Sequence, residues 1–380
     1  MIVNLKEQHC ENFLQSLHKE QWQEVRLGEV AEMNNGKARP KNYGGYLIYG
    51  GNGILGYGNQ YNCDSETIIV GRVGAYCGCV YYEKQPIWVS DNAIIVKAKS
   101  ENNIKFLYYV LKSMKLNDYA LGSSHPLLTQ NLLNTLQVEI PKDTTMQQKI
   151  AEILSSFDDK IDLLHRQNKT LESLALTLFR HYFIDNPNRS EWEEKPLKYF
   201  GNIICGKTPP KNQKEYFNGT YPFIKIPDMH NNVFVFQTAD SLTQQGLDSQ
   251  KAKTLPPFSV CVSCIATIGV VSMNANIAQT NQQINSIVPH KEHYRYFLYC
   301  SMKSSFDELE AMASGGTATA NLNTTDFSNM KLLLPREKEI LRFHTETLPF
   351  FDKIYNNTKQ IQNLQAMRDV LLKAIFKERE

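Results

Sequence analysis

The sequence lacks the marks of several common protein classes. No run of about 18 apolar residues occurs in the 380-residue chain, and residues 1–20 include polar side chains such as Lys6 and Glu11, so we expect neither a membrane span nor a secretory signal. The eight cysteines are scattered without a disulfide-like framework, which predicts a reduced, cytoplasmic protein. Cys261-x-x-Cys264 and Cys77-x-Cys79 have no second Cys or His pair at zinc spacing, so no metal site is predicted.

Motifs for catalysis and cofactor binding are also missing. There is no phosphate-binding Gly-x-x-x-x-Gly-Lys-Ser/Thr and no dinucleotide glycine fingerprint opening a helix. Asp185-Asn-Pro-Asn188 partly matches the Asp/Asn-Pro-Pro-aromatic motif of adenine methyltransferases, but it lacks the second Pro and the aromatic residue, and a helix-ending linker explains it better. No compact carboxylate cluster suggests a nuclease. The sequence therefore predicts a chain that performs no catalysis and needs no cofactor of its own.

Two long amphipathic stripes are the strongest pattern that is present. In the first, core positions recur in alternating steps of four and three, as in a coiled coil: Ile150, Leu154, Phe157, Ile161, Leu164, Asn168, Leu171, Ala175, Leu178 and Tyr182. A second stripe runs from Phe343 to Ile375. Asp159-Lys-Ile161 of the first stretch aligns with Asp352-Lys-Ile354 of the second, an offset of 352 − 159 = 193. A helix of roughly forty residues is about 60 Å long and needs a partner. We predict that the two helices pair as an antiparallel coiled coil, with Asn168 and Asn357 fixing its register.

The helices belong to a longer internal repeat. The segment from Trp22 to Leu27 recurs from Trp192 to Leu197, and Gly36–Lys41 recurs as Gly206–Lys211, both at an offset of 170. Phe106-Leu-Tyr108 matches Phe297-Leu-Tyr299, and the offset drifts to 194 by the end of the repeat. Because the order of features is kept while their spacing drifts, two copies of one unit explain the pattern.

Each globular part mixes strand and helix signals. Helices are predicted at Ile104–Lys115 and Tyr294–Ser304, and strands at Thr67–Val70, Cys77–Tyr82, Ala93–Val96, Ser259–Ile265, Gly269–Met273 and Ile284–Val288. The linker between the copies is predicted at His181–Glu191. The predicted fold class is α+β, with two tandem mixed domains, each followed by a long helix. The predicted boundaries are 1–140 and 186–335 for the domains (the latter with the linker), and 141–185 and 336–380 for the helices.

Polar residues suited to nucleic-acid contact recur in the loops of both copies. Arg72 lies in Gly71-Arg-Val-Gly74, where glycines permit close approach to a phosphate or a base edge. An ion pair with Asp64, Glu66 or Asp91 inside the domain is the alternative. The other candidate DNA-binding residues are basic or carry small polar or amide side chains: Lys37, Arg39, Lys41, Ser123, Ser124, His125, Thr129, Gln130, Lys207, Lys211, Asn281, Gln282, Gln283, Thr317, Thr319 and Asn321. Any one of them also fits an ordinary surface loop, and their recurrence favours a shared function.

Neither globular part has an excess of basic charge. Lys+Arg and Asp+Glu number 14 and 14 in residues 1–145, and 12 and 12 in residues 190–335. A protein that binds DNA alone usually carries a basic excess, because phosphate neutralisation dominates affinity. Two neutral domains suggest readers that depend on a partner to hold the duplex.

In the order of these motifs the chain resembles the DNA-specificity subunits of type I restriction–modification systems. The resemblance rests on the units opening at Trp22 and Trp192, Gly71-Arg-x-Gly74, Thr280-Asn-Gln-Gln-Ile284, and the long helix with Gln147-Gln-Lys-Ile150. The second copy departs from the pattern at Lys338-Glu339 and has no arginine that matches Arg72.

The resemblance implies two target-recognition domains, each reading one half of a bipartite site in double-stranded DNA. The paired helices would be a spacer and a docking surface for two methyltransferase subunits, which would bind S-adenosylmethionine and flip the target base. A restriction/translocase subunit would join for cleavage, and no membrane partner is implied. The rival hypothesis is a non-catalytic protein-interaction scaffold whose repeated domains bind protein, and an enzyme is the third.

Overall fold

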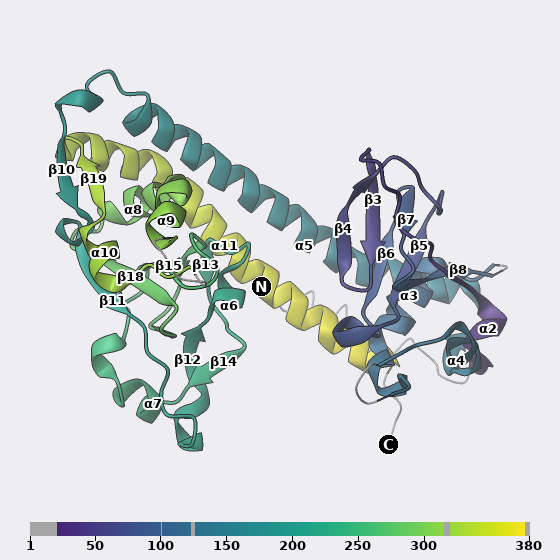
Figure 1. The fold of residues 1–380 in the computed structure, drawn as a ribbon. Coiled ribbons are helices and arrows are strands. Elements are labelled where there is room, and N and C mark those ends of the chain that lie inside the picture. The colour runs from purple at the N-terminus through teal and green to yellow at the C-terminus, as the bar shows by residue number, and fades with distance from the viewer. Residues whose placement is uncertain (1–20, 100, 123–125, 315–319, 377–380) are drawn as a thin grey trace, which may run out of the picture. The chain divides into compact units, whose positions relative to one another are not determined.

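The computed structural model describes residues 21–99, 101–122, 126–314 and 320–376. It divides into two compact units, the first formed by Met1–Ile161 with Asn363–Glu380 and the second by Asp162–Gln362. Two long helices, α5 (Thr144–Phe179) and α11 (Glu337–Phe376), contribute residues to both units (Figure 1). In the part of the chain that the structure describes, no helix combines the length and apolar character that a bilayer crossing requires.

Three sheets build the first unit. An antiparallel ribbon joins β1 (Trp22–Arg26) to β9 (Gln137–Pro141). The main sheet is antiparallel with the order β2-β8-β5-β6, and a smaller sheet has the order β4-β3-β7, in which β3 and β7 are parallel. The remaining bounds are β2 (Ala31–Asn35), β3 (Tyr46–Gly50), β4 (Gly53–Gly58), β5 (Thr67–Gly71), β6 (Val80–Glu83), β7 (Ile87–Val89), β8 (Ala93–Ala98), α2 (Leu27–Val30), α3 (Ile104–Ser113) and α4 (Gln130–Thr135).

The second unit repeats this plan. Its ribbon joins β10 (Glu193–Pro196) to β19 (Lys331–Leu334), its main sheet has the order β11-β18-β15-β16-β13, and its smaller sheet has the order β14-β12-β17. The strand bounds are β11 (Gly201–Cys205), β12 (Phe217–Ile224), β13 (Phe234–Val235), β14 (Asp240–Leu242), β15 (Val260–Ser263), β16 (Val271–Asn274), β17 (Gln279–Thr280) and β18 (Ile284–Pro289). The helix bounds are α6 (Ile226–Met229), α7 (Gln244–Asp248), α8 (Tyr294–Ser304), α9 (Phe306–Ala313) and α10 (Thr324–Asn329).

The matching strand orders confirm the repeat. The edge strand β2 pairs with β8 as β11 pairs with β18, and β3 runs parallel to β7 as β12 runs parallel to β17. The second copy adds β13 to the far edge of its main sheet, next to β16. The predicted α+β class with two tandem mixed domains is confirmed.

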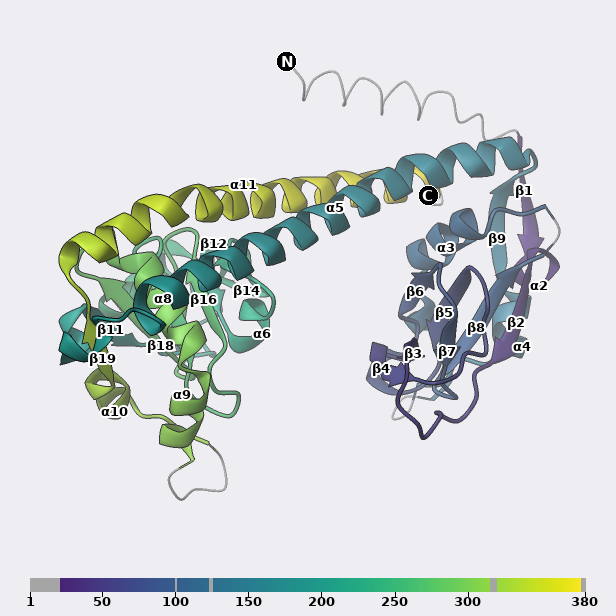
Figure 2. The same ribbon diagram turned by 90° about the horizontal axis from the view of Figure 1, so that it is seen from above.

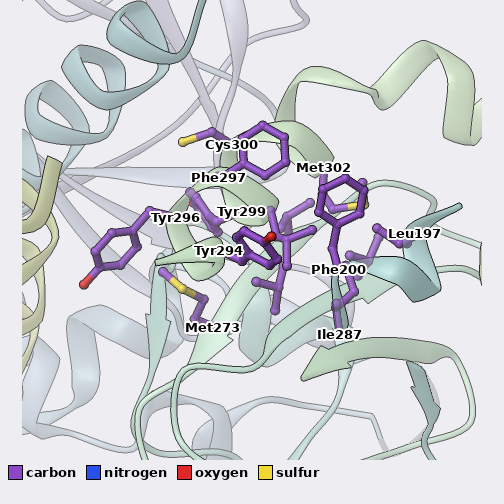
Figure 3. Close-up of a cluster of buried hydrophobic side chains, with 14 of the residues drawn as sticks. Leu197, Phe200, Met273, Ile287, Tyr294, Tyr296, Phe297, Tyr299, Cys300 and Met302 are labelled. Carbon is purple, nitrogen blue, oxygen red and sulfur yellow. The ribbon is translucent and has the colours of Figure 1, made fainter. Parts of the chain in front are cut away.

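One amphipathic helix covers the main sheet of each unit (Figure 2). In the first unit the side chain of Asn103 accepts the Phe106 N–H and so caps α3, whose apolar face is buried. In the second unit α8 buries a row of aromatic and sulfur-containing residues against the sheet and against η6 (Leu197–Tyr199). Figure 3 shows this cluster, which includes Leu197, Phe200, Met273, Ile287, Tyr294, Tyr296, Phe297, Tyr299, Cys300 and Met302.

In each domain, a phenylalanine at the end of a long helix packs against aromatic residues of the core. In the first unit the Phe376 ring lies 6.4 Å from Trp22 and 5.7 Å from Phe106, centroid to centroid. In the second unit the same arrangement is built at 6.2 and 5.1 Å by Phe183 with Trp192 and Phe297. Each domain therefore packs on the start of its own following helix and on the end of the other long helix.

Within the second unit the two helices run antiparallel. Asn357 Nδ2 donates to Asn168 Oδ1 at 2.9 Å, and the Tyr182 hydroxyl bonds the Glu346 carboxylate at 3.0 Å. Between these contacts residue numbers rise by 182 − 168 = 14 along α5 and fall by 357 − 346 = 11 along α11, as antiparallel neighbours require. The asparagine pair predicted to set the register is therefore formed. A continuous coiled coil over the full helix length stays a prediction.

Within the first unit a partly buried ion pair joins the two helices. Arg368 Nη1 lies 2.6 Å from Asp158 Oδ1, and the Tyr109 hydroxyl donates to Asp158 Oδ2 at 2.7 Å. Because Tyr109 belongs to α3, the carboxylate of Asp158 ties the covering helix to both long helices at once. Apolar stripe residues of both helices are buried in the core of this unit, among them Ile150, Leu154, Leu371 and Ile375.

Two sequence predictions are wrong in detail. The linker does not begin at His181, because Arg180–Ile184 continue α5 as a π-helical turn and Phe183 is only 3% exposed in the core. The predicted strand at Cys77–Tyr82 begins only at Val80, because Gly78 adopts φ +87° and turns the chain there. The strands of the smaller sheets were not predicted, since β7, β14 and β17 have only two or three residues each and β4 and β12 are interrupted by glycine.

The asparagine pair gives a stability test. Asn357 is 1% exposed, so Asn357→Leu leaves the Asn168 side-chain oxygen without its donor in an apolar seam. We expect a loss of about 1–3 kcal/mol in the free energy of unfolding, and recovery of much of it in the double variant Asn168→Leu/Asn357→Leu. Urea unfolding followed by circular dichroism measures both. Asn356→Leu, at the exposed neighbouring position, is the matched control. A double variant that loses the sum of the two single losses would contradict coupling.

Candidate nucleic-acid interface

Arg72 is held at the end of the main sheet of the first unit, where β5 leaves it. Its backbone N–H donates to the Asn92 carbonyl at 3.1 Å, and its carbonyl accepts the Leu128 N–H at 2.9 Å. Gly71 must be glycine, because a Cβ there would lie 2.4 Å from the Tyr76 carbonyl oxygen and 2.6 Å from that of Gly51. Three separate loops therefore fix the backbone that carries the guanidinium.

The charge of this guanidinium is not neutralised within the domain. Arg72 Nη1 donates to Asn35 Oδ1 at 3.1 Å, and Nε is buried without an acceptor. The structure records no ion pair for Arg72 among the described residues, which include all three carboxylates proposed as alternative partners. One of those carboxylates, Glu66, instead accepts a hydrogen bond from the Tyr82 hydroxyl. The cation therefore keeps donors available for an external anion or base edge.

The basic loop that follows β2 has a fixed backbone and free side chains. The Lys37 N–H donates to the Val89 carbonyl at 3.0 Å, and the Lys37 carbonyl accepts Trp88 Nε1 at 3.2 Å. At the preceding residue, Gly36, a Cβ would lie 1.9 Å from the Ser90 carbonyl oxygen, so only glycine fits. The side chains of Lys37, Arg39 and Lys41 are exposed to solvent.

The second unit builds the same loop frame. The Lys207 N–H donates to the Thr280 carbonyl at 3.0 Å, and a Cβ on Gly206 would lie 2.2 Å from the Asn281 carbonyl oxygen. Lys207 and Lys211 are exposed. The exposed amide of Gln282 accepts the Thr208 hydroxyl at 2.8 Å, so it borders the lysine loop directly.

The two frames differ where Arg72 stands. The equivalent residue is Cys264, whose N–H donates to the Gln283 carbonyl and whose carbonyl accepts the Leu322 N–H, both at 2.8 Å. Its thiol is buried, and burial raises the pKa of Cys264 to about 11. The second copy therefore presents no guanidinium at this point and instead carries the amide turn before β18.

The remaining predicted residues fall into three groups. Thr129 accepts the Leu132 N–H as the cap of α4, and Gln130 begins that helix. Asn281 is 8% exposed and donates its amide to Gln283 Oε1 at 2.8 Å, whereas Asn321 is exposed beside the Cys264–Ile265 backbone. The third group lies outside the described residues: Ser123, Ser124, His125, Thr317 and Thr319. Contact with DNA stays a prediction for all of them.

Exposed tyrosines next to the first basic loop were missed. Tyr43 is 83% exposed, and its ring centroid lies 6.3 Å from that of Tyr57, while Tyr46 and Tyr61 pair at 5.0 Å. The dense alternation of Gly and Tyr from Tyr43 to Tyr61 was the available signal. Such rings stack on bases and donate hydroxyl hydrogen bonds. In the part of the chain that is described, no group of three or more His, Cys, Asp or Glu is arranged to hold a metal.

Comparison with known proteins agrees with this architecture. The family model of the type I restriction modification DNA specificity domain matches twice, at residues 19–173 and 189–366. The HindI specificity subunit of Haemophilus influenzae is 35% identical over 347 residues, which cover 70% of this chain and 75% of that protein. The MjaIX specificity subunit of Methanocaldococcus jannaschii is 27% identical, over 79% of this chain and 75% of that one.

A solved structure shares the fold. The crystal structure of a type I restriction–modification S subunit from M. genitalium aligns with a TM-score of 0.61 and 18% identity, covering 94% of this chain and 97% of that chain. The family model covers most of the chain, and its two matches fall on the two structural copies. This chain belongs to the family of type I restriction–modification DNA specificity subunits.

Proposed function

We propose that the chain is the DNA-reading subunit of a type I complex and that each globular domain reads one half of a bipartite site. The observation that carries this proposal is the loop frame built twice, at Gly36-Lys37 and at Gly206-Lys207, with different side chains on it. A shared frame with exchanged side chains is what two readers of different base sequences need, because phosphate contacts position a protein whereas base-edge contacts specify the sequence.

The two readers use different chemistry. The first offers a guanidinium, Arg72, whose fork fits guanine O6 and N7 or a phosphate. The second offers the exposed amide of Gln282, which fits the N6 and N7 groups of adenine. The exposed lysines of both basic loops would contact the sugar–phosphate backbone. The two halves of the recognised site are therefore expected to differ in sequence.

Catalysis is assigned to partner subunits. Two methyltransferase subunits would supply S-adenosylmethionine and the base-flipping chemistry, and a restriction/translocase subunit would join them for cleavage. The balanced charge of both domains supports dependence on partners, since neutral domains release few counterions from DNA. Leu163 and Leu174 support docking along α5, because both are at least 40% exposed and lie eleven residues, about three turns, apart on one helix face.

The alternative is a scaffold whose domains bind protein instead of DNA. Reversing charge in the basic loops separates the two, because only a DNA reader would lose affinity for DNA. The variant Lys37→Glu/Lys207→Glu in the assembled complex is the direct comparison, since both side chains are exposed and both backbones are fixed by hydrogen bonds to neighbouring strands.

Arg72 gives the first test of DNA reading. If it reads a base, Arg72→Ala should weaken binding of the assembled complex to its site by about 1–3 kcal/mol and relax one base position. If it contacts a phosphate, all sequences should be bound more weakly and the slope of log K against log salt should fall by about one unit. Asn35→Ala removes the acceptor that orients the Arg72 guanidinium, so it should also weaken DNA binding, by a smaller amount. Affinity for DNA that is unchanged in a folded Arg72→Ala variant would make the residue structural.

Exchange of one domain tests modularity. Replacing residues 22–140 with the matching domain of a relative keeps the junctions at the ends of the β1–β9 ribbon, where Trp22 lies opposite Pro141. We expect one half of the methylated site to change and the other half to stay. Sequencing of methylated bases in cells that carry the complex reads both halves. The reciprocal exchange of residues 192–335 should change the other half. A single exchange that altered both halves would contradict independent readers.

The spacer helices give a third test. Four residues inserted into α5 next to Asn168 add about 6 Å and some 40° of rotation to the helix. At about 3.4 Å per base pair, the gap between the two half-sites should grow by one or two base pairs. The same methylation mapping measures this gap, and exchange of Lys169 and Thr170 for other helix formers without insertion is the control. An unchanged gap in a well-folded variant would refute the proposal that the long helices set the distance between the half-sites.

A further inference from the structure

Each unit contains a cavity that the DNA-reading loops do not line. In the first unit a cavity of about 480 Å³ lies between the β1–β9 ribbon and the end of α3. Trp22 and Phe376 contribute aromatic surface to it, Glu24 lies on the ribbon side, and Ser113 lies on the helix side. All of its lining residues belong to the first unit.

The second unit contains the same cavity, with a volume of about 460 Å³. Trp192 and Glu194 take the ribbon positions at the offset of 170, Phe183 replaces the helix-end phenylalanine, and Ser304 replaces the serine of the covering helix. The cavity has thus been kept in both copies although its other lining residues differ. A packing defect in one copy would not be expected to recur at the equivalent place in the other.

The charge of the cavities is acidic. Three carboxylates and two basic residues line the second cavity, and three carboxylates and one basic residue line the first. Among the described residues no ion pair is recorded for Glu194, Asp307 or Glu308. The pKa of Glu308 is raised, first by partial burial of its carboxylate, although much of the side chain reaches solvent, and second by the negative charge of Glu194. Carboxylates crowded in this way favour a bound cation.

A second observation is a buried hydrogen-bond donor in the second cavity that has no acceptor in the described part of the chain. Trp192 is nine-tenths buried, it lines the cavity, and its indole N–H has no acceptor among the described residues. Buried polar groups in folded proteins nearly always have a partner. The indole N–H needs an acceptor, which a backbone carbonyl of a docked segment would supply. The carboxylates and aromatic rings that line the cavity suit a Lys or Arg side chain next to an apolar one, because aromatic rings attract cations on their faces and pack against apolar groups.

We propose that each cavity docks one copy of the same basic and apolar segment of the methyltransferase subunit. This inference rests on the proposed function, since it takes the partner from there and adds the place and chemistry of contact. Two equivalent cavities on separate units explain how one chain binds two identical partners, each through the same contact. The DNA-reading loops remain free, because none of the candidate DNA-binding residues lines either cavity.

Charge reversal tests the proposal one cavity at a time. Glu194→Lys/Glu308→Lys should lower the number of methyltransferase copies in the complex from two to one, and Glu24→Lys/Asp118→Lys should do the same at the other cavity. Combining all four changes should release both copies, with a Kd for the methyltransferase subunit that is at least tenfold weaker. Light scattering coupled to size-exclusion chromatography reads the copy number. Glu310→Lys and Glu29→Lys are matched controls at exposed positions that line neither cavity, and they should retain both copies.

Crosslinking supplies a test that does not depend on the folding of the variants. A photoreactive amino acid placed at Ser113 or at Ser304 should capture the methyltransferase subunit, and mass spectrometry should find the same basic peptide at both. Normal assembly of the reversed variants, or crosslinks to different peptides or to a second copy of this chain, would overturn the proposal. A wild-type chain that bound neither methyltransferase nor DNA would overturn the proposed function as well, so the two failures are distinguishable.

Discussion

The structure depends on one aromatic contact that is made twice. In each unit a phenylalanine at the end of a long helix lies between the tryptophan that opens the domain and a phenylalanine of the covering helix. In the first unit that side chain is Phe376, more than 350 residues from its partner Trp22, so the fold is closed by a contact of very high sequence separation. Neither domain can complete its core without the helix that follows the other domain. Each long helix contributes residues to both units, so a change in one helix affects both cores.

The repeated frame makes the differences between the copies informative. The start of α5 is tied to the covering helix by Gln147, which is buried and accepts the Asn103 N–H at 3.0 Å. The corresponding joint in the second copy uses Glu337, whose pKa is lowered to about 2 because hydrogen bonds from Lys291, Tyr294 and His293 outweigh the effect of its partial burial. A neutral amide and a carboxylate thus make the same connection. The geometry was kept while the chemistry changed, as at Arg72 and Cys264.

The two long helices could be predicted from the sequence, because a regular spacing of apolar residues indicates which face of a helix is buried. The two stripes that contain Asn168 and Asn357 were visible as regular spacings of apolar residues, and the asparagine pair forms as expected. The smaller sheets were not visible, since β3 and β4 are rich in glycine and tyrosine, and β3 also pairs with β7, about 40 residues later, in a register that no local pattern encodes. The candidate site was only partly visible for a related reason. Composition cannot distinguish the exposed amide of Gln282 from the buried amide of its neighbour Asn281, which is hydrogen-bonded to Gln283.

Charge balance has a consequence for how such a subunit selects a site. A reader with a large basic excess would bind any duplex through its phosphates and would gain little from correct bases. In the two domains described here, basic and acidic residues are equal in number, and the candidate DNA contacts include a guanidinium with one neutral partner and two lysine loops with fixed backbones. On the proposed function, we expect most of the non-specific affinity to come from the partner subunits. Dividing the work in this way lets a few side chains decide the sequence, because their contribution is not diluted by indiscriminate attraction to the backbone.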